Sequence, residues 1–168
     1  MRIIIGLGNP GKKYERTRHN AGFRAVNELA RRLKLEWKNN KKLKAGVAQG
    51  NGFVLIKPQT FMNESGATAA AALNRYKLPP EELTVIHDDL DISLGKYKIS
   101  ADSRSAGHKG VESIIGRLKT KNFRRIRIGI APALKKAPAE EFVLKNFSAA
   151  EDKIVKEIIS EALDNELK

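Results

Sequence analysis

Three short apolar runs, each leading into a polar loop, constrain the fold of this chain more than any other feature. They are residues 2–7 (RIIIGL), 53–56 (FVLI) and 83–86 (LTVI). Continuous apolar runs of this length are typical of buried strands. Helical patterns alternate with the strand patterns along the chain. We therefore expect an α/β fold, a three-layer sandwich in which helices flank a mixed, largely parallel sheet.

The remaining elements follow from residue spacing and turn signals. The Asn51-Gly52 pair predicts a hairpin between two strands. Arginine and isoleucine alternate over residues 124–130, which predicts a strand with one solvent-exposed basic face. Ser148 and Glu151 match the S-x-x-E capping box of a helix start. Further patterns predict helices over residues 21–34, 65–76, 109–119 and 149–167, and a strand over 96–100.

Length and composition exclude several classes of protein. The 168 residues fit one domain, residues 1–168. No apolar run approaches the roughly 20 residues that cross a bilayer, and the short apolar start lacks the form of a signal peptide. We therefore expect a cytoplasmic protein with no membrane partner. The chain has no cysteine, which excludes disulfides, thiol catalysis and zinc sites with Cys ligands.

The charge gives the first indication of a partner. Lysine and arginine total 32 against 19 acidic residues, which gives a net charge of +13. A field of this sign attracts polyanions and accelerates their encounter. Nucleic acid is the leading candidate partner, and an anionic membrane surface is the second. A general bias toward lysine would give the same charge without any such partner.

The glycine-rich loop at residues 6–11 (GLGNPG) matches the dinucleotide-binding pattern letter for letter. That site requires a helix to begin inside the loop, so that backbone N–H groups point at the pyrophosphate. Pro10 has no N–H and biases Asn9 away from helical angles. The helical spacing also begins only near Ala21. We therefore expect no nucleotide cofactor here.

The chain has three histidines, His19, His87 and His108, and each falls in a segment that we interpret as a polar loop. A core role is therefore not expected for any of them. His19 lies among basic residues, directly before Asn20, a good helix N-cap. An imidazole takes a proton near neutral pH, so His19 is a candidate general base.

The segment at residues 87–91 (HDDLD), at the end of a predicted strand, allows two interpretations. Its His and Asp side chains are ligands for Mg²⁺, Mn²⁺ or Zn²⁺. Alternatively, one carboxylate orients a catalytic histidine from another loop. In an extended chain His87, Asp89 and Asp91 point to one side and Asp88 to the other.

The loop at residues 58–66 (PQTFMNESG) joins a strand to a helix. It could be a capping loop, with Asn63 or Ser65 as N-cap and Phe61 as a hydrophobic staple. It could also form the wall of a site, where Phe61 or Met62 packs against a base or side chain and Asn63 donates its amide to a substrate oxygen.

The segment at residues 103–110 (SRSAGHKG) also precedes a helix. Arg104, Lys109 and the N–H groups of the helix start could form an anion-binding rim. A solvated loop without a ligand explains the same residues.

The ordered set of motifs is more specific than any one of them. GLGNPG, Y-x-x-T-R-H-N, P-x-T-F-M-N-x-S-G, H-D-D-L-D and G-H-x-G follow one another between Arg2 and about Leu144. This set resembles the bacterial-type peptidyl-tRNA hydrolases. The resemblance implies one α/β domain with a mixed sheet that needs no metal or other cofactor. It also implies hydrolysis of the ester between a peptide and the 3′ end of tRNA, which returns tRNA for reuse.

The resemblance assigns roles to individual residues. His19 corresponds to the catalytic histidine, Asp88 to its aspartate partner, and Asn9 to the asparagine that contacts the peptide and helps to reject unblocked aminoacyl-tRNA. The residues expected to contact the substrate, including the tRNA 3′ end, are Tyr14, Phe61, Met62, Asn63, His108 and Lys109. The partner is the acceptor stem and 3′ end of peptidyl-tRNA, and we expect a monomer without an obligate protein partner.

Two departures from the family pattern leave an alternative open. Lys109 stands where the family has an asparagine, and an ammonium group only donates hydrogen bonds, whereas an amide also accepts them. The chain ends at Lys168, so we expect the family's final helix to be missing or reduced. The alternative function is a non-catalytic RNA-binding relative of the same fold. A metal-dependent phosphoesterase that uses residues 87–91 is a third.

Overall fold

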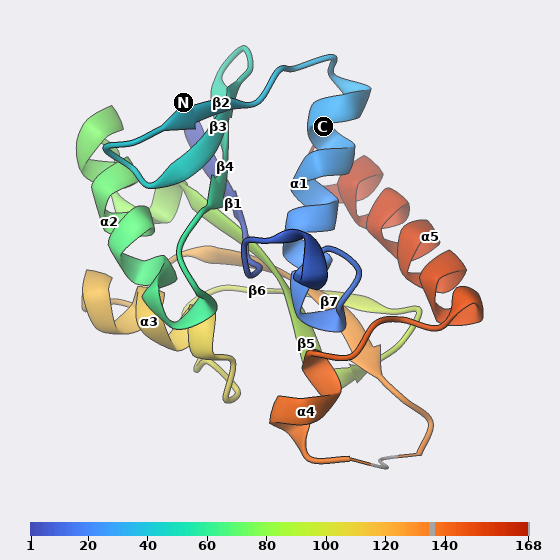
Figure 1. Cartoon of the computed structure of the whole chain (residues 1–168). Helices are drawn as coiled ribbons and strands as arrows, with labels where there is room; N and C mark the ends of the chain where they lie inside the picture. Colours follow the sequence, from blue (N-terminus) through green and yellow to red (C-terminus); the bar gives the residue numbers. More distant parts are fainter. Residues whose placement is uncertain (135–136, 168) are drawn as a thin grey trace.

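The computed structural model describes residues 1–134 and 137–167, and in this part of the chain a seven-stranded mixed sheet is covered by helices on both faces (Figure 1). The strand order is β2-β3-β4-β1-β5-β7-β6. The central neighbours β4, β1, β5 and β7 run parallel, and β2, β3 and β6 add antiparallel pairs at the two edges. The strands are β1 (Arg2–Gly6), β2 (Lys38–Asn40), β3 (Ala45–Gln49), β4 (Phe53–Pro58), β5 (Leu83–Ser93), β6 (Tyr97–Ser100) and β7 (Arg124–Ala131).

Helices α1 and α5 cover one face of the sheet, and α2 and α3 cover the other, which confirms the predicted three-layer α/β sandwich (Figure 1). The α-helices are α1 (Ala21–Arg32), α2 (Ser65–Tyr76), α3 (Lys109–Leu118), α4 (Ala139–Val143) and α5 (Ala149–Glu166). Short 3-10 helices are η1 (Lys12–Tyr14), η2 (Arg18–Asn20), η3 (Met62–Glu64) and η4 (Pro80–Glu82). None of the helices among the described residues is both long and apolar enough to cross a membrane.

The apolar strand β1 explains why both faces of the sheet are covered. Ile3 and Ile5 pack into the core under α2 and α3, while Ile4 packs into the core under α1 and α5. All three side chains are almost fully buried. Because successive side chains of a strand point to opposite faces, a continuous apolar run needs a helical layer on each side.

Close contact between α1 and the sheet fixes the place of the segment before the helix. A Cβ atom added at Gly22 would lie 2.2 Å from the carbonyl oxygen of Ile86 and 2.5 Å from the backbone nitrogen of Leu7. Only a glycine allows this approach of helix to strand. The start of α1, and η2 before it, are thereby held over the carboxyl ends of β1 and β5.

Several local predictions are confirmed. β3 and β4 form the antiparallel hairpin around Asn51-Gly52. Ser148 and Glu151 form both hydrogen bonds of the capping box at the start of α5. The helix predicted over residues 65–76 is α2 with the same bounds.

Two predictions need correction, and two elements were not predicted. β5 continues to Ser93, so residues 87–91 lie within a strand and not in a loop beyond it. β2 and α4 were not predicted, because the first is a three-residue polar edge strand and the second a helix of five residues. The basic face of β7 is not solvent-exposed at Arg125, which is 1% exposed. Its guanidinium donates to the carbonyl oxygens of Ser103 and Arg104 and so anchors the loop before α3.

Candidate active site

A cavity of about 450 Å³ opens at the carboxyl ends of the parallel strands, where ligands of such sheets bind. Four segments supply its wall: the loop after β1, the loop after β4, residues 88–90 within β5 and the start of α3, with a further contribution from α4. The predicted site residues that line it are Asn9, His19, Phe61, Met62, Asn63, Asp88, His108 and Lys109. Residues at distant sequence positions therefore converge on one cavity.

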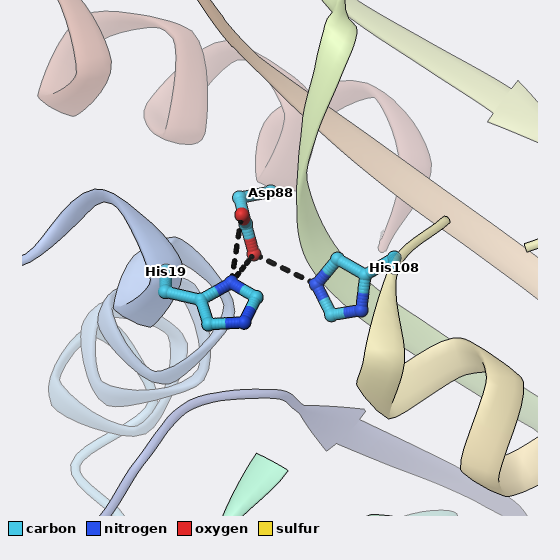
Figure 2. Close-up of side chains that lie close together, drawn as sticks. All are labelled: His19, Asp88 and His108. Carbon is cyan, nitrogen blue, oxygen red and sulfur yellow. Dashed lines mark hydrogen bonds and ion pairs between the residues drawn. The ribbon is translucent and has the colours of Figure 1, made fainter. Parts of the chain in front are cut away.

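Two histidines meet one carboxylate at the base of this cavity (Figure 2). Nδ1 of His19 lies 3.0 and 2.9 Å from the two carboxylate oxygens of Asp88. Nε2 of His108 lies 2.8 Å from Oδ1 of the same carboxylate. The side chain of His19 is 11% exposed, that of Asp88 3% and that of His108 7%. Burial at this level makes a hydrogen-bonded network strong and its geometry specific.

The hydrogen bonds assign the protons on both rings. The backbone N–H groups of Gly110 and Val111 donate to Nδ1 of His108, at 3.1 and 3.3 Å. Nδ1 of His108 therefore holds a lone pair, and its Nε2–H donates to Asp88. The carboxylate likewise orients the Nδ1–H of His19, which leaves Nε2 as the free nitrogen of that ring. His108 is at the same time the N-cap of α3, because these two N–H groups belong to its first turn.

Burial and charge act in opposite directions on these groups. Burial alone would lower the pKa of His19, but the Asp88 carboxylate and its hydrogen bond raise it above the ordinary value. Burial alone would raise the pKa of Asp88, but the adjacent His108 and His19 rings hold it below its ordinary range. Asp88 is thus an anion that stabilises a proton on His19.

His87 corrects the expectation that no histidine belongs to the core. Its ring is fully buried in β5 and packs edge-on against His108, with 4.7 Å between the ring centroids. Its Nδ1 lies 2.7 Å from the carbonyl oxygen of Asp88, to which it donates. Burial lowers the pKa of His87 well below the ordinary value, so the ring is neutral.

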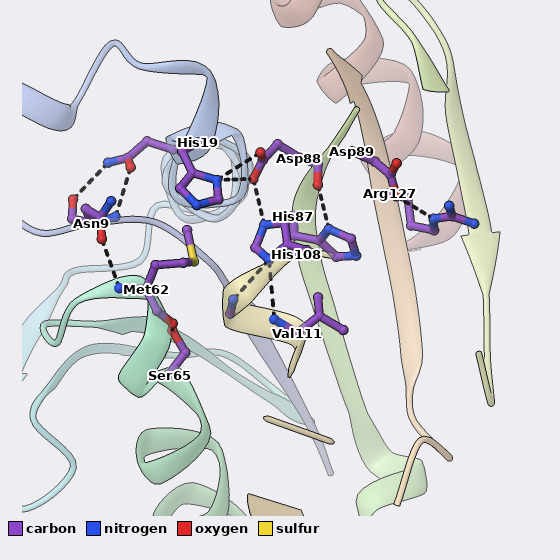
Figure 3. Close-up of polar contacts among 12 residues, drawn as sticks. Asn9, His19, Met62, Ser65, His87, Asp88, Asp89, His108, Val111 and Arg127 are labelled. Atoms are coloured by element: carbon purple, nitrogen blue, oxygen red, sulfur yellow. Dashed lines mark hydrogen bonds and ion pairs between the residues drawn. The ribbon is translucent and has the colours of Figure 1, made fainter. Parts of the chain in front are cut away.

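Asn9 is held at the cavity wall by three hydrogen bonds (Figure 3). The Asn20 side chain binds both its backbone N–H and its carbonyl, each at 2.9 Å. The backbone N–H of Met62 donates to Oδ1 of Asn9, also at 2.9 Å. Because Oδ1 is occupied by this donor, the Nδ2 amino group is the end of the amide that a substrate can reach. Asn20 stands at the predicted N-cap position of α1, but its side chain makes no capping bond there.

The loop after β4 is part of the wall and not a capping loop. Glu64 and not Asn63 or Ser65 precedes α2, and it makes no capping bond. Ser65 donates to the carbonyl of Met62 instead. Phe61 is 56% exposed at the cavity and therefore does not act as a buried staple.

Tyr14 is the predicted residue that the structure does not bring to the cavity wall. It lies half-buried in η1, and its carbonyl accepts hydrogen bonds from Thr17. Lys109 lines the cavity at the first turn of α3, and its ammonium lies 3.7 Å from Glu112 one turn on.

Two further contributions were not found from the sequence. The α4 segment adds Ala139, Glu140, Val143 and Leu144 to the wall. Its helix of five residues is too short to show a periodic pattern in the sequence. Arg18 binds the chain just after that segment, through hydrogen bonds to the carbonyl of Asn146 and the carboxylate of Glu151, which are 128 and 133 residues away in sequence.

The three groups at the base also bear on metal binding. One ligand atom from each of His19, Asp88 and His108 lies within 4.8 Å of the others. A cation on Nε2 of His108 would have to displace its proton, and the N–H donors on Nδ1 prevent that proton from moving there. The alternative ligand set at residues 87–91 diverges, since Asp88 binds His19 whereas Asp89 binds Arg127 at 2.8 Å. The geometry thus favours a carboxylate that orients a histidine, and metal independence stays a prediction.

Known proteins share both the sequence and this architecture. A family model described as peptidyl-tRNA hydrolase matches residues 3–166. The peptidyl-tRNA hydrolase of Aquifex aeolicus is 42% identical over 167 residues, covering 97% of this chain and 86% of that protein. The one of Mycobacterium ulcerans is 44% identical over 167 residues, covering 96% and 87%. The crystal structure of peptidyl-tRNA hydrolase from Acinetobacter baumannii matches with a TM-score of 0.92 at 33% identity, covering 98% of this chain and 85% of that one. The chain therefore belongs to the peptidyl-tRNA hydrolase family.

Proposed function

We propose that this protein hydrolyses the ester bond between a peptide, or an N-blocked aminoacyl group, and the 3′ end of tRNA, and so releases tRNA for reuse. The observation that carries the proposal is the pair of His19 and Asp88 at the base of the cavity, 2.9 Å apart. It leaves Nε2 of His19 free to act on a water molecule. The family membership of the chain supports the same reaction.

The reaction requires a base that takes a proton from water and then gives a proton to the leaving ribose oxygen. Nε2 of His19 takes a proton from water as the oxygen attacks the ester carbonyl carbon. The tetrahedral intermediate then collapses, and the same nitrogen gives the proton to the leaving ribose oxygen. Asp88 holds the ring in the correct tautomer and stabilises the imidazolium between the two steps. General bases of this kind contribute about 10²–10⁴-fold to the rate.

Asn9 supplies the donor for the substrate. Its Nδ2 group, fixed by the bond from Met62 to Oδ1, can bind the carbonyl oxygen of the substrate or the developing oxyanion, with Asn63 as a second donor from the same wall. Loss of one such donor costs roughly 3 kcal/mol in the transition state. A site built to pair with a peptide group leaves a charged α-amine without a partner, which accounts for discrimination against unblocked aminoacyl-tRNA.

The tRNA is bound through charge and stacking. Exposed Phe61 offers a face for a terminal base, and Lys109 offers a cation at the cavity rim. The net charge of +13 attracts the acceptor stem through its phosphates, without reading the sequence. Tyr14 would act on tRNA from outside the cavity. We assign His108 the role of holding the Asp88 carboxylate, rather than that of binding the substrate. We expect a cytoplasmic monomer that needs neither a metal nor a protein partner.

The test compares N-acetyl-aminoacyl-tRNA with unblocked aminoacyl-tRNA, in EDTA. The proposal predicts rapid deacylation of the blocked substrate only. If the protein binds tRNA tightly and in a salt-sensitive manner but turns nothing over, it is the RNA-binding relative. A parallel reaction without EDTA completes the test, because deacylation that EDTA abolishes would contradict metal independence.

A further inference from the structure

The α4 segment forms part of the cavity wall, yet little within the segment itself can hold it there. α4 has five residues, and an isolated helix of fewer than about 12 residues is marginal in water. Ala139, Val143 and Leu144 of this segment line the cavity, so a change in their position would change the space for substrate. The wall therefore depends on contacts with other elements.

Phe142 and Val143 pack against the hydrophobic core, and Arg18 adds several polar contacts. Its Nη1 donates to the carbonyl of Asn146 at 3.0 Å, and its backbone N–H donates to the carbonyl of Lys145 at 3.1 Å. The guanidinium carbon lies 4.2 Å from the centre of the Phe142 ring, which belongs to α4. The two residues before Arg18 add a bridge between Thr17 and Asn146 and a hydrogen bond from the Phe147 N–H to the carbonyl of Arg16.

The same guanidinium also binds the first turn of α5. Nη2 of Arg18 lies 2.8 and 3.1 Å from the two carboxylate oxygens of Glu151, which also closes the capping box with Ser148. The Arg18 side chain is 9% exposed, so solvent screens the pair only weakly. Arg18 thus connects the end of α4 and the start of α5 to η2, in which His19 is the next residue.

We infer that Arg18 is a positioning residue, which holds the α4 wall at a fixed distance from His19. This inference rests on the proposed function. The hydrogen bonds that position His19 and Asp88 do not involve the wall residues 139–144, so displacement of the wall would weaken ground-state and transition-state binding alike. Such a loss appears in KM and leaves kcat unchanged.

Arg24 gives a matched control. It too binds the first turn of α5, with Nη2 2.7 Å from Asp152, and its guanidinium lies 5.4 Å from the Phe147 ring. In contrast to Arg18, its hydrogen bond and its ion pair reach α5 and not residues 139–146. Arg24→Lys therefore reports the cost of weakening an arginine–carboxylate pair to α5 without releasing the wall.

The experiment measures kcat and KM for N-acetyl-aminoacyl-tRNA, and hydrogen exchange of residues 140–147, in wild type, Arg18→Lys and Arg24→Lys. Lysine keeps the charge but loses the planar fork. We expect Arg18→Lys to raise KM about tenfold, which corresponds to 1.4 kcal/mol. We also expect kcat and the pH profile to stay close to wild type and the amide protons of Phe142, Lys145 and Phe147 to exchange faster. Arg24→Lys should change neither.

The inference is overturned if Arg18→Lys leaves KM and exchange as in Arg24→Lys, or if it lowers kcat and shifts the pH profile, which would place its action on His19. If Arg18→Lys does not fold, Phe142→Leu removes the stacking from the α4 side alone and should give the same rise in KM and exchange. Hydrogen exchange needs no substrate. If the wild type fails to hydrolyse N-acetyl-aminoacyl-tRNA, the proposed function is rejected. The exchange rates still decide whether Arg18 holds the α4 wall.

Discussion

The imidazole of His19, in a 3-10 helix, and the carboxylate of Asp88, in β5, lie 2.9 Å apart at the base of the cavity. Neither local segment would create this pair alone. Gly22 lets α1 approach β5 closely at Ile86, which places η2 beside Asp88. The pair is buried, and its charges therefore interact more strongly than at the surface.

The first prediction concerns pH. Asp88 raises the pKa of His19 above about 6.5, and only the neutral ring can take a proton. Activity should therefore fall as the pH drops through this raised pKa, with the midpoint of the acid limb of kcat/KM above 6.5. Asp88→Asn removes the charge and should move this midpoint to lower pH while kcat falls by roughly 10²–10⁴-fold. A profile with the same midpoint in both proteins would show that another group titrates.

The second prediction separates the two roles of His108. Asparagine is a good N-cap, so His108→Asn should keep α3 intact while it removes the second donor to Asp88. A hydrogen bond to a charged group contributes about 1.5–3 kcal/mol, so kcat should fall roughly 10–100-fold. His108→Ala should lose in addition about 1 kcal/mol of stability, measured by urea unfolding. If His108→Asn keeps the wild-type kcat, the hydrogen bond from His108 to Asp88 does not contribute to catalysis.

The third prediction concerns Asn9. Asn9→Asp keeps the acceptor for the Met62 N–H but replaces the amino group with an oxygen anion. Hydrolysis of the blocked substrate should fall by about 10²–10³-fold, as for the loss of an oxyanion donor. The ratio of blocked to unblocked substrate hydrolysis should fall as well. An unchanged ratio in a time course of both substrates would mean that Asn9 does not discriminate between them.

The fourth prediction concerns the close contact of α1. Gly22→Ala places a Cβ 2.2 Å from the Ile86 carbonyl and should cost at least about 1–3 kcal/mol of unfolding free energy. Gly116 lies in α3, and a Cβ there would meet no atom within 4 Å apart from its chain neighbours and the backbone of its own helix. Gly116→Ala should therefore be neutral or stabilise by roughly 0.5–1 kcal/mol. Equal effects in thermal unfolding would contradict the role given to Gly22.

Much of the fold could be predicted because its signals are local. The hairpin at Asn51-Gly52, the capping box at Ser148 and the apolar run of β1 each depend on a few adjacent residues. A mixed, largely parallel sheet flanked by helices follows from the alternation of strand and helix patterns, although the short edge strand β2 does not.

The errors arose where tertiary contacts override local composition. The polar residues of HDDLD suggest a loop, yet β5 continues through them because Asp88 and Asp89 find partners in His19, His108 and Arg127. Arg125 looked like a surface residue, but the carbonyls of the loop before α3 satisfy it in the interior.

The candidate site shows the same division. The sequence pointed to His19, Asp88 and Asn9, which do converge on the cavity. It could not show that Asn20 holds Asn9 or that His108 holds Asp88, because each interaction joins segments whose proximity only the fold determines. No pattern in the sequence predicts α4 or its contribution to the cavity wall.

The central claim is that His19 is the base. The most direct test measures single-turnover hydrolysis of N-acetyl-aminoacyl-tRNA by wild type and His19→Ala, with tRNA affinity measured on the same samples. We predict that the variant loses about 10²–10⁴-fold in rate and keeps the wild-type affinity. Hydrolysis by His19→Ala at the wild-type rate would contradict the account, since the base would then lie elsewhere.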